Sequence, residues 1–125
     1  VLVKNKNSLL PLAKSAGRIA AIGPLADRQS EMMGPWCMAG DENEAIGIVQ
    51  GLCETFGTGN VVHAAGCLVD DIVNPAEIEA AVATARVSEV VVLCLGEDRQ
   101  HCGEAASRTL PRPSAGQMQL ARAIM

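Results

Sequence analysis

A run of six apolar residues, from Val90 to Leu95, dominates the hydrophobic pattern of this chain and includes three consecutive valines. β-branched residues favour extended backbone, and a short apolar run without polar alternation is typical of a strand buried on both faces. Gly96 follows the run and ends it. The pattern therefore predicts a parallel strand at the centre of a sheet.

Two other short apolar segments predict further strands. Residues 18–23 read RIAAIG and are followed by Pro24, and residues 60–64 read NVVHA and are followed by an Ala-Gly pair. Both segments have strand length and end at residues that favour turns.

Helical periodicity fills the intervals between these strands. Apolar residues at spacings of three and four predict a helix over residues 44–56. Asn74 and Pro75 form a cap and a first helical position, which predicts a second helix that continues to about residue 86. Ser114 caps a third helix that runs to the end of the chain.

Alternating strands and helices of these lengths predict an α/β fold, a three-layer sandwich with a mostly parallel sheet and helices on both faces. A chain of 125 residues has the length of one ordinary domain. We expect a single partial α/β domain over residues 1–125, with an N-terminal arm at 1–17 and an α/β core at 18–125. The arm is too short and too polar in its middle for a helix, so we expect it to pack along another element.

Composition and charge exclude several classes of partner. The formal net charge of −4, without long charged runs, argues against nucleic acid and against anionic membranes. No apolar run approaches the ~20 residues that span a bilayer, so we expect a soluble chain. No signal peptide is visible, although a processed or truncated start would look the same. Aromatic residues make up 2% of the chain, so only Trp36 and Phe56 could stack on a sugar or a base.

The five cysteines lie far apart, without a CxxC pair and without a histidine at ligand spacing. This arrangement argues against a zinc site, and we expect no metal and no cofactor. An odd number of cysteines cannot pair completely within one chain, and free cysteine is commonly a small buried hydrophobe. We expect reduced, structural thiols.

Two long loops follow expected strand ends, after Gly23 and after Gly96, where ligands of parallel sheets bind. The second loop holds the densest set of titratable residues in the chain: Glu97, Asp98, Arg99, His101, Cys102, Glu104 and Arg108. A solvated loop whose charges pair with one another is the ordinary interpretation. The functional interpretation makes one carboxyl a general acid or base. Glu104 suits this role better than Glu97, because small neighbours leave room for a substrate, and Glu97 is then an orienting residue.

Other residues along the chain suggest further kinds of chemistry. His101 and Cys102 suggest a thiol nucleophile with an imidazole base, but adjacent residues seldom face each other in such a pair. His63 lies within an expected strand, where a hydrogen-bonded structural histidine is the commoner outcome than a ligand. Asp70 and Asp71 follow a strand end and suggest a solvated turn more than a cation site. The first strand ends in GPLADRQ and not in GxGxxG, so the chain lacks a dinucleotide fingerprint.

Six blocks of sequence, in order, carry a resemblance to a known family. They are LVKNKNSLLPL, RIAAIGPLAD, MMGPW, VVHAAGC, VVVLCLGE and GEAASR. This series closely resembles the second domain of family 3 glycoside hydrolases, particularly bacterial periplasmic β-glucosidases, up to about Ala121. The resemblance implies part of a retaining β-glucosidase whose first domain, a (β/α)₈-type barrel absent from this sequence, carries a nucleophilic Asp. The implied mechanism is a double displacement by two carboxyls ~5–5.5 Å apart.

The resemblance also implies roles for single residues. The GEAASR block implies that the acid/base carboxyl is Glu104, the residue that the composition of the loop also favours. Arg108 in that block is implied to hold the loop in shape. Trp36 in the MGPW block forms part of the substrate wall, although a tryptophan wedged between two domains is an equal alternative. Asp27 in the GPLAD block anchors loops at the domain junction. Cys102, just before GEA, departs from the family pattern, as does the segment TLPRPSAGQ after it, and both leave substrate preference open.

The expected partners follow from these roles. They are a β-glucoside or oligosaccharide substrate and the barrel domain of the same protein, in a periplasmic or extracellular location, and we expect the fragment alone to be inactive. Strands missing beyond residue 125 would leave an exposed sheet edge, which predicts dimerisation or aggregation. The alternative function is a noncatalytic α/β carbohydrate-binding or interaction module on the same scaffold, in which Glu104 is a surface charge.

Overall fold

The computed structural model describes all residues from Val1 to Met125. Three short parallel strands, β1 (Ile19–Ile22), β2 (Val61–Ala64) and β3 (Val90–Leu93), form one sheet in the order β2-β1-β3. In its register, Ile19 of β1 lies opposite Val61 of β2 and Val90 of β3. The strands lie within the predicted segments, and their parallel pairing confirms the prediction.

The predicted place of β3 is wrong, because β1 is the central strand and β3 lies at an edge. All four residues of β1 are fully buried, whereas those of β3 are only partly buried. A run of valines indicates that both faces of a strand are covered, but it carries no information on whether both edges are hydrogen-bonded. The expectation of dimerisation through an exposed edge stays a prediction.

Three α-helices connect or follow the strands: α1 (Ile48–Phe56), α2 (Pro75–Arg86) and α3 (Ala115–Ile124). The Asn74 side chain caps α2 by accepting a hydrogen bond from Ala76 N at 3.2 Å, and the Ser114 hydroxyl accepts one from Gln117 N at 3.4 Å at the start of α3. The first helix is shorter than predicted. A 3-10 turn, η3 (Glu42–Glu44), precedes it, and Gly47 begins it in extended conformation.

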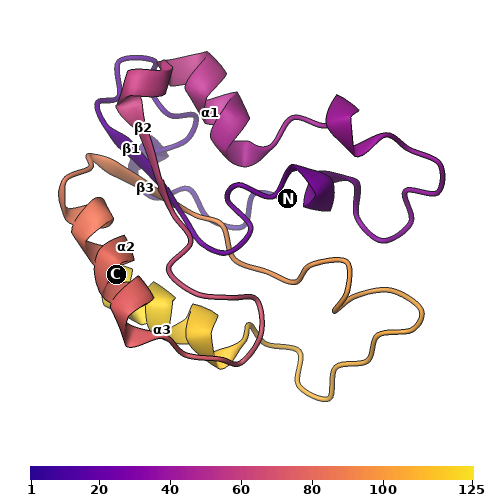
Figure 1. Ribbon diagram of the computed structural model, residues 1–125. Helices are drawn as coiled ribbons and strands as arrows, with labels where there is room; N and C mark the ends of the chain where they lie inside the picture. Colours follow the sequence, from indigo (N-terminus) through magenta and orange to yellow (C-terminus); the bar gives the residue numbers. More distant parts are fainter.

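The helices cover both faces of the sheet, which confirms the three-layer sandwich (Figure 1). Successive residues of β1 point to opposite faces. Ala20 and Ile22 pack with residues of α2 and α3, while Ala21 packs with residues of α1. None of the helices has the length and the apolar character that crossing a membrane requires.

The segments outside these layers form the N-terminal arm and two long loops. Residues 1–11 of the arm are exposed, and part of the arm lines a hollow together with Glu89 and Val90. The first loop (residues 23–47) joins β1 to α1 and contains η2 (Gln29–Met33) and η3, and the second loop (residues 94–114) joins β3 to α3. A further 3-10 turn, η4 (Thr58–Asn60), precedes β2. Figure 1 shows both long loops extending to the same side of the sandwich, beyond the carboxyl ends of their strands.

Candidate functional site

A hollow of about 370 Å³ lies where the two long loops meet, and Glu104 and Trp36 both line it. Glu104 comes from the second loop, which follows β3, and Trp36 comes from the first loop, which follows the neighbouring strand β1. Both side chains are exposed, Trp36 to 64%. The other residues that line the hollow are Pro35, Arg99, Gln100, Cys102, Gly103, Ala105 and Ala106.

Gly103 makes the contact between the loops beside Glu104. Its φ of +108° lies in the region that favours glycine, and a Cβ at this position would lie 3.2 Å from Pro35 Cβ. A side chain there would push the second loop away from Pro35 and, with it, the carboxyl of the next residue. The small residue before Glu104 therefore fixes where the carboxyl stands, and does not merely leave room for a substrate.

The carboxyl of Glu104 makes no ion pair and no hydrogen bond within this chain, whose ion pairs join other residues. The ordinary interpretation of the second loop is that its charged groups pair with one another, and most of these groups do form ion pairs. Glu104 is the carboxylate of the loop that stays free and faces the hollow.

Glu97 and Arg108 form an ion pair that spans the loop around Glu104. Arg108 Nε donates to Glu97 Oε1 at 2.5 Å, and the side chains are 28% and 30% exposed, respectively. The pair joins the root of the loop to the residue four positions after Glu104. The ion pair leaves neither side chain free to react, and the role of the two residues in holding the loop in shape stays a prediction.

Arg99 ties the second loop to the first on both sides of Trp36. Its backbone N donates to Glu31 Oε2 at 2.7 Å, and its guanidinium pairs with the carboxylate of Glu42. The hydrogen bond to Glu42, and then the charge of that carboxylate, raise the pKa of Arg99. Within the first loop, Gln29 Nε2 donates a hydrogen bond to Ala45 O at 2.6 Å. Sequence reasoning missed Glu31 and Glu42, because nothing in the pattern of the first loop pairs them with Arg99.

Asp98 organises the turn that follows Glu97. It is 7% exposed, its Oδ1 lies 2.6 Å from His101 Nδ1, and its backbone oxygen accepts from Cys102 Sγ at 3.2 Å. Burial alone would raise the pKa of Asp98, but hydrogen bonds from His101 and from Gln100 N outweigh it, so the pKa is lowered. His101 and Cys102 both turn to Asp98 and not to each other, so they form no nucleophile and base pair.

Asp27 lies apart from Glu104, beside a separate hollow of about 180 Å³ at the carboxyl ends of β1 and β2. Its side chain is exposed and makes no hydrogen bond within this chain, so its role as an anchor at a domain junction stays a prediction. His63 lines the same hollow, but it is exposed and makes no hydrogen bond. The prediction of a hydrogen-bonded structural histidine is wrong, because His63 lies in the less covered edge strand β2.

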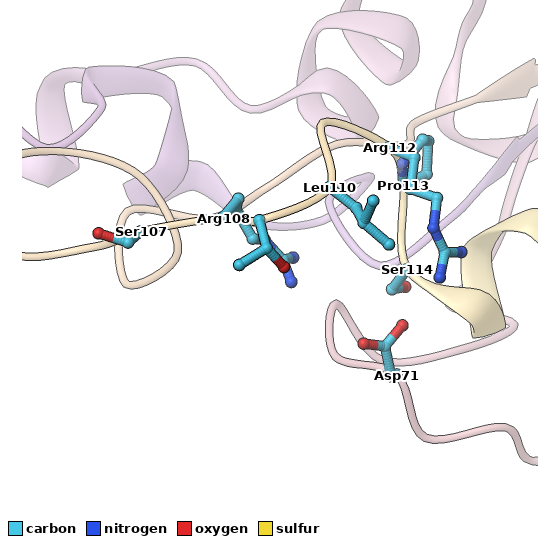
Figure 2. A pocket seen from close by; sticks show the side chains of 8 residues that line it. Asp71, Ser107, Arg108, Leu110, Arg112, Pro113 and Ser114 are labelled. Carbon is cyan, nitrogen blue, oxygen red and sulfur yellow. The ribbon is translucent and has the colours of Figure 1, made fainter.

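The two aspartates after β2 serve local structure. Asp70 Oδ1 accepts from Ile72 N at 2.9 Å, which is the predicted turn, and Asp71 Oδ1 accepts from Ala115 N at 2.8 Å at the start of α3. Figure 2 shows Asp71 close to Ser114 in a polar hollow of about 210 Å³, with Arg108 and Arg112 also lining it. Contacts of this hollow fix the C-terminal end of the second loop.

All five cysteines are free thiols, and two of them are buried. Burial, followed by the negative charges of Glu77 and Asp70, raises the pKa of Cys67 to about 11. Burial also raises the pKa of Cys94. Protonated thiols inside the two core clusters are unreactive, which supports the predicted structural role.

Comparison with known proteins adds family information to this geometry. The family model described as "Glycosyl hydrolase family 3 C-terminal domain" matches residues 1–125. A periplasmic beta-glucosidase of Salmonella typhimurium is 36% identical over 129 residues, which cover 87% of this chain and 17% of that protein. A beta-xylosidase of Formosa agariphila is 30% identical over 114 residues, covering 86% of this chain and 16% of the relative.

Solved structures show the same arrangement of elements. A beta-glucosidase from Listeria innocua in complex with glucose superposes with a TM-score of 0.86 at 36% identity, over 99% of this chain and 16% of that one. A beta-glucosidase from Bifidobacterium adolescentis gives a TM-score of 0.78 at 28% identity, over 99% of this chain and 18% of that one. The chain thus spans less than a fifth of the length of these relatives.

Proposed function

We propose that this chain, which belongs to glycosyl hydrolase family 3 as part of its C-terminal domain, supplies two parts of a retaining β-glucosidase. They are the general acid/base carboxyl and part of the substrate wall. Relatives named beta-glucosidase and beta-xylosidase support a β-linked glycoside as the class of substrate. A periplasmic location is part of the same proposal, since one relative is named a periplasmic enzyme.

The observation that carries the proposal is a free, exposed carboxylate at Glu104 in a loop whose other charged groups are engaged. Solvent-exposed carboxylates are common, but this one faces a hollow with the single tryptophan of the chain, and both sides of its loop are held by specific contacts. A carboxyl that must be held in place and yet stay accessible fits an acid/base that acts on a substrate bound elsewhere.

The proposed mechanism divides the reaction between two domains. Glu104, protonated, donates its proton to the glycosidic oxygen as that bond breaks, while a carboxylate of the first domain attacks the anomeric carbon from the opposite face. Glu104, now ionised, then takes a proton from a water molecule, which hydrolyses the glycosyl-enzyme bond with net retention. The residues of this chain contribute proton transfer and substrate orientation, and the nucleophile comes from outside it.

The first loop offers a surface for the partner domain. Four of its large apolar side chains are strongly exposed: Met32 at 44%, Trp36 at 64%, Met38 at 91% and Ile46 at 57%. Scattered apolar residues are ordinary on a surface, but this number on one loop beside the candidate acid/base suggests a surface that is covered in the whole protein. We propose that the barrel domain covers Met32, Met38 and Ile46 and leaves Trp36 facing the substrate.

The first test compares the intact protein with the isolated chain 1–125 on an aryl β-glucoside. The intact protein should release glucose first as the β-anomer, which ¹H NMR detects before mutarotation, and the isolated chain should release none because it lacks the nucleophile. A first product in the α-form would contradict the retaining mechanism. Binding of glucosides without any hydrolysis by the intact protein would favour the noncatalytic module.

The second test concerns Trp36 as a sugar-stacking wall. Trp36→Ala in the intact enzyme should raise KM for a β-glucoside roughly fivefold, because an aromatic face on a sugar contributes on the order of 1 kcal/mol, and Trp36→Phe should raise it less. Val87→Ala is the control, since Val87 is as exposed as Trp36, at 63%, but follows α2, lies on neither long loop and does not line the hollow. Loss of stability with an unchanged KM in Trp36→Ala would instead identify a tryptophan wedged between domains.

A further inference from the structure

The side chain of Gln117 is fully buried at the start of α3, and both ends of its amide are engaged. Its Oε1 accepts from Gly96 N at 2.7 Å, and its Nε2 donates to Gly96 O at 2.8 Å and to Val69 O at 3.3 Å. One side chain therefore pairs with both backbone groups of a residue 21 positions earlier, in the manner of a neighbouring strand.

Gly96 lies three residues beyond the end of β3, near the start of the second loop. Its φ of +155° lies at the border of the region that favours glycine, and a Cβ there would lie 3.2 Å from Leu25 Cδ1. The next residue is Glu97, whose carboxylate holds Arg108 at 2.5 Å on the far side of Glu104. The direction in which the chain leaves Gly96 therefore sets the position of the ion pair that closes the loop.

The same turn of α3 also fixes the other end of the loop. Ser114 caps the helix through Gln117 N, and Asp71 holds Ala115 N at 2.8 Å. Gly116 packs so closely that a Cβ would lie 2.8 Å from Ile72 O. The first turn of α3 is thus held in place by its contacts with Asp71 and Ile72. Gln117 belongs to this turn, so its side chain starts from a fixed position.

We propose that Gln117 is a positioning residue for the acid/base carboxyl, which it sets through Gly96, Glu97 and Arg108 without touching substrate. The proposal rests on the proposed function, since it assigns Gln117 to proton donation by Glu104. A buried glutamine that only stabilised the fold would affect all substrates of the enzyme alike. Replacing a glutamine that positions Glu104 should instead slow the substrates whose leaving oxygen needs a proton more than those whose leaving group departs without one.

The test uses Gln117→Met in the intact enzyme, with an alkyl β-glucoside and a dinitrophenyl β-glucoside as substrates. Methionine has a similar length but leaves the Gly96 and Val69 groups without their partner. The kcat/KM for the alkyl glucoside should fall about tenfold or more, because a small misplacement of a catalytic group is costly, while that for the dinitrophenyl glucoside should change little. The ratio of the two values in one preparation does not depend on how much of the protein is folded.

Leu120→Ala is the matched control, since Leu120 is equally buried on the same helix but belongs to the apolar core cluster and holds no backbone group of Gly96. It should lower the Tm and leave the substrate ratio at the wild-type value. An unchanged ratio in Gln117→Met, or the same changed ratio in Leu120→Ala, would overturn the proposal. Wild-type enzyme and Glu104→Gln are measured alongside: if Glu104→Gln itself leaves the ratio unchanged, the proposed function fails and not only the role of Gln117.

A second variant, Gln117→Glu, tests the donor directly and serves if Gln117→Met does not fold. An ionised carboxylate keeps the acceptor for Gly96 N but repels the carbonyls of Gly96 and Val69, whereas the protonated acid can donate to one of them. The substrate ratio, normalised to wild type at each pH, should therefore move toward the wild-type value as the pH is lowered. A normalised ratio that is independent of pH would contradict a role for the Nε2 donor.

Discussion

Glu104→Gln in the intact enzyme should lower kcat/KM for an alkyl β-glucoside by about 10² to 10⁴-fold, the usual contribution of a positioned general acid. Glutamine keeps the size of the side chain but has no proton of suitable acidity to give. A dinitrophenolate leaves without protonation, so kcat/KM for a dinitrophenyl glucoside should change little. Steady-state kinetics with both substrates in one preparation give the result.

The control for this substitution is Glu79→Gln. Glu79 is an exposed glutamate on α2, lies on neither long loop and makes no ion pair. It should behave as wild type with both substrates. Near-normal hydrolysis of the alkyl glucoside by Glu104→Gln would place the acid/base on another residue and leave Glu104 as a surface charge.

Breaking the ion pair between Glu97 and Arg108 is expected to have the next largest effect. Arg108→Met and Glu97→Gln should each lower kcat/KM for the alkyl glucoside by roughly 10 to 100-fold, since the loop that carries Glu104 loses the contact that closes it. The double variant should lose little more than either single variant, because each alone already removes the one interaction. A double-mutant cycle on kcat/KM measures this coupling.

Stability separates a positioning role from a merely structural one. Both side chains are close to a third exposed, so solvent screens the pair, and its loss should cost only about 0.2–1 kcal/mol in the free energy of unfolding. Arg86→Met, at an exposed arginine of α2 without an ion pair, is the matched control and should leave kcat/KM unchanged. Strictly additive losses of kcat/KM in the cycle would show that Glu97 and Arg108 act independently.

Much of the fold could be predicted because local signals and tertiary structure agree in it. Asn74 and Ser114 cap helices at the predicted positions, and a glycine follows closely after the end of each strand. The order of strands could not be predicted in the same way. Val90–Leu93 has the stronger apolar pattern, yet Ile19–Ile22 is the central strand. The side chains of a strand indicate whether its faces are buried, but not whether its backbone is hydrogen-bonded along one edge or both.

The candidate site, too, could be predicted only in part. Glu104 and Trp36 could be selected from local sequence, by a loop of titratable residues, by the scarcity of aromatics and by a family resemblance. The contacts that hold them could not, since Arg99 finds Glu31 and Glu42 at separations of 68 and 57 residues. Gln117 lay within a predicted helix as an ordinary polar residue, and only its burial against Gly96 distinguishes it.

The most direct test of Glu104 as the acid/base uses azide with Glu104→Ala in the intact enzyme and a dinitrophenyl β-glucoside as substrate. Removing the carboxylate leaves the glycosyl-enzyme without a base to activate water, and azide needs no base, so turnover should rise with azide concentration. ¹H NMR of the product should show β-glucosyl azide. Either α-glucosyl azide, or glucose alone at an unaltered rate, would contradict the assignment of Glu104 as the acid/base.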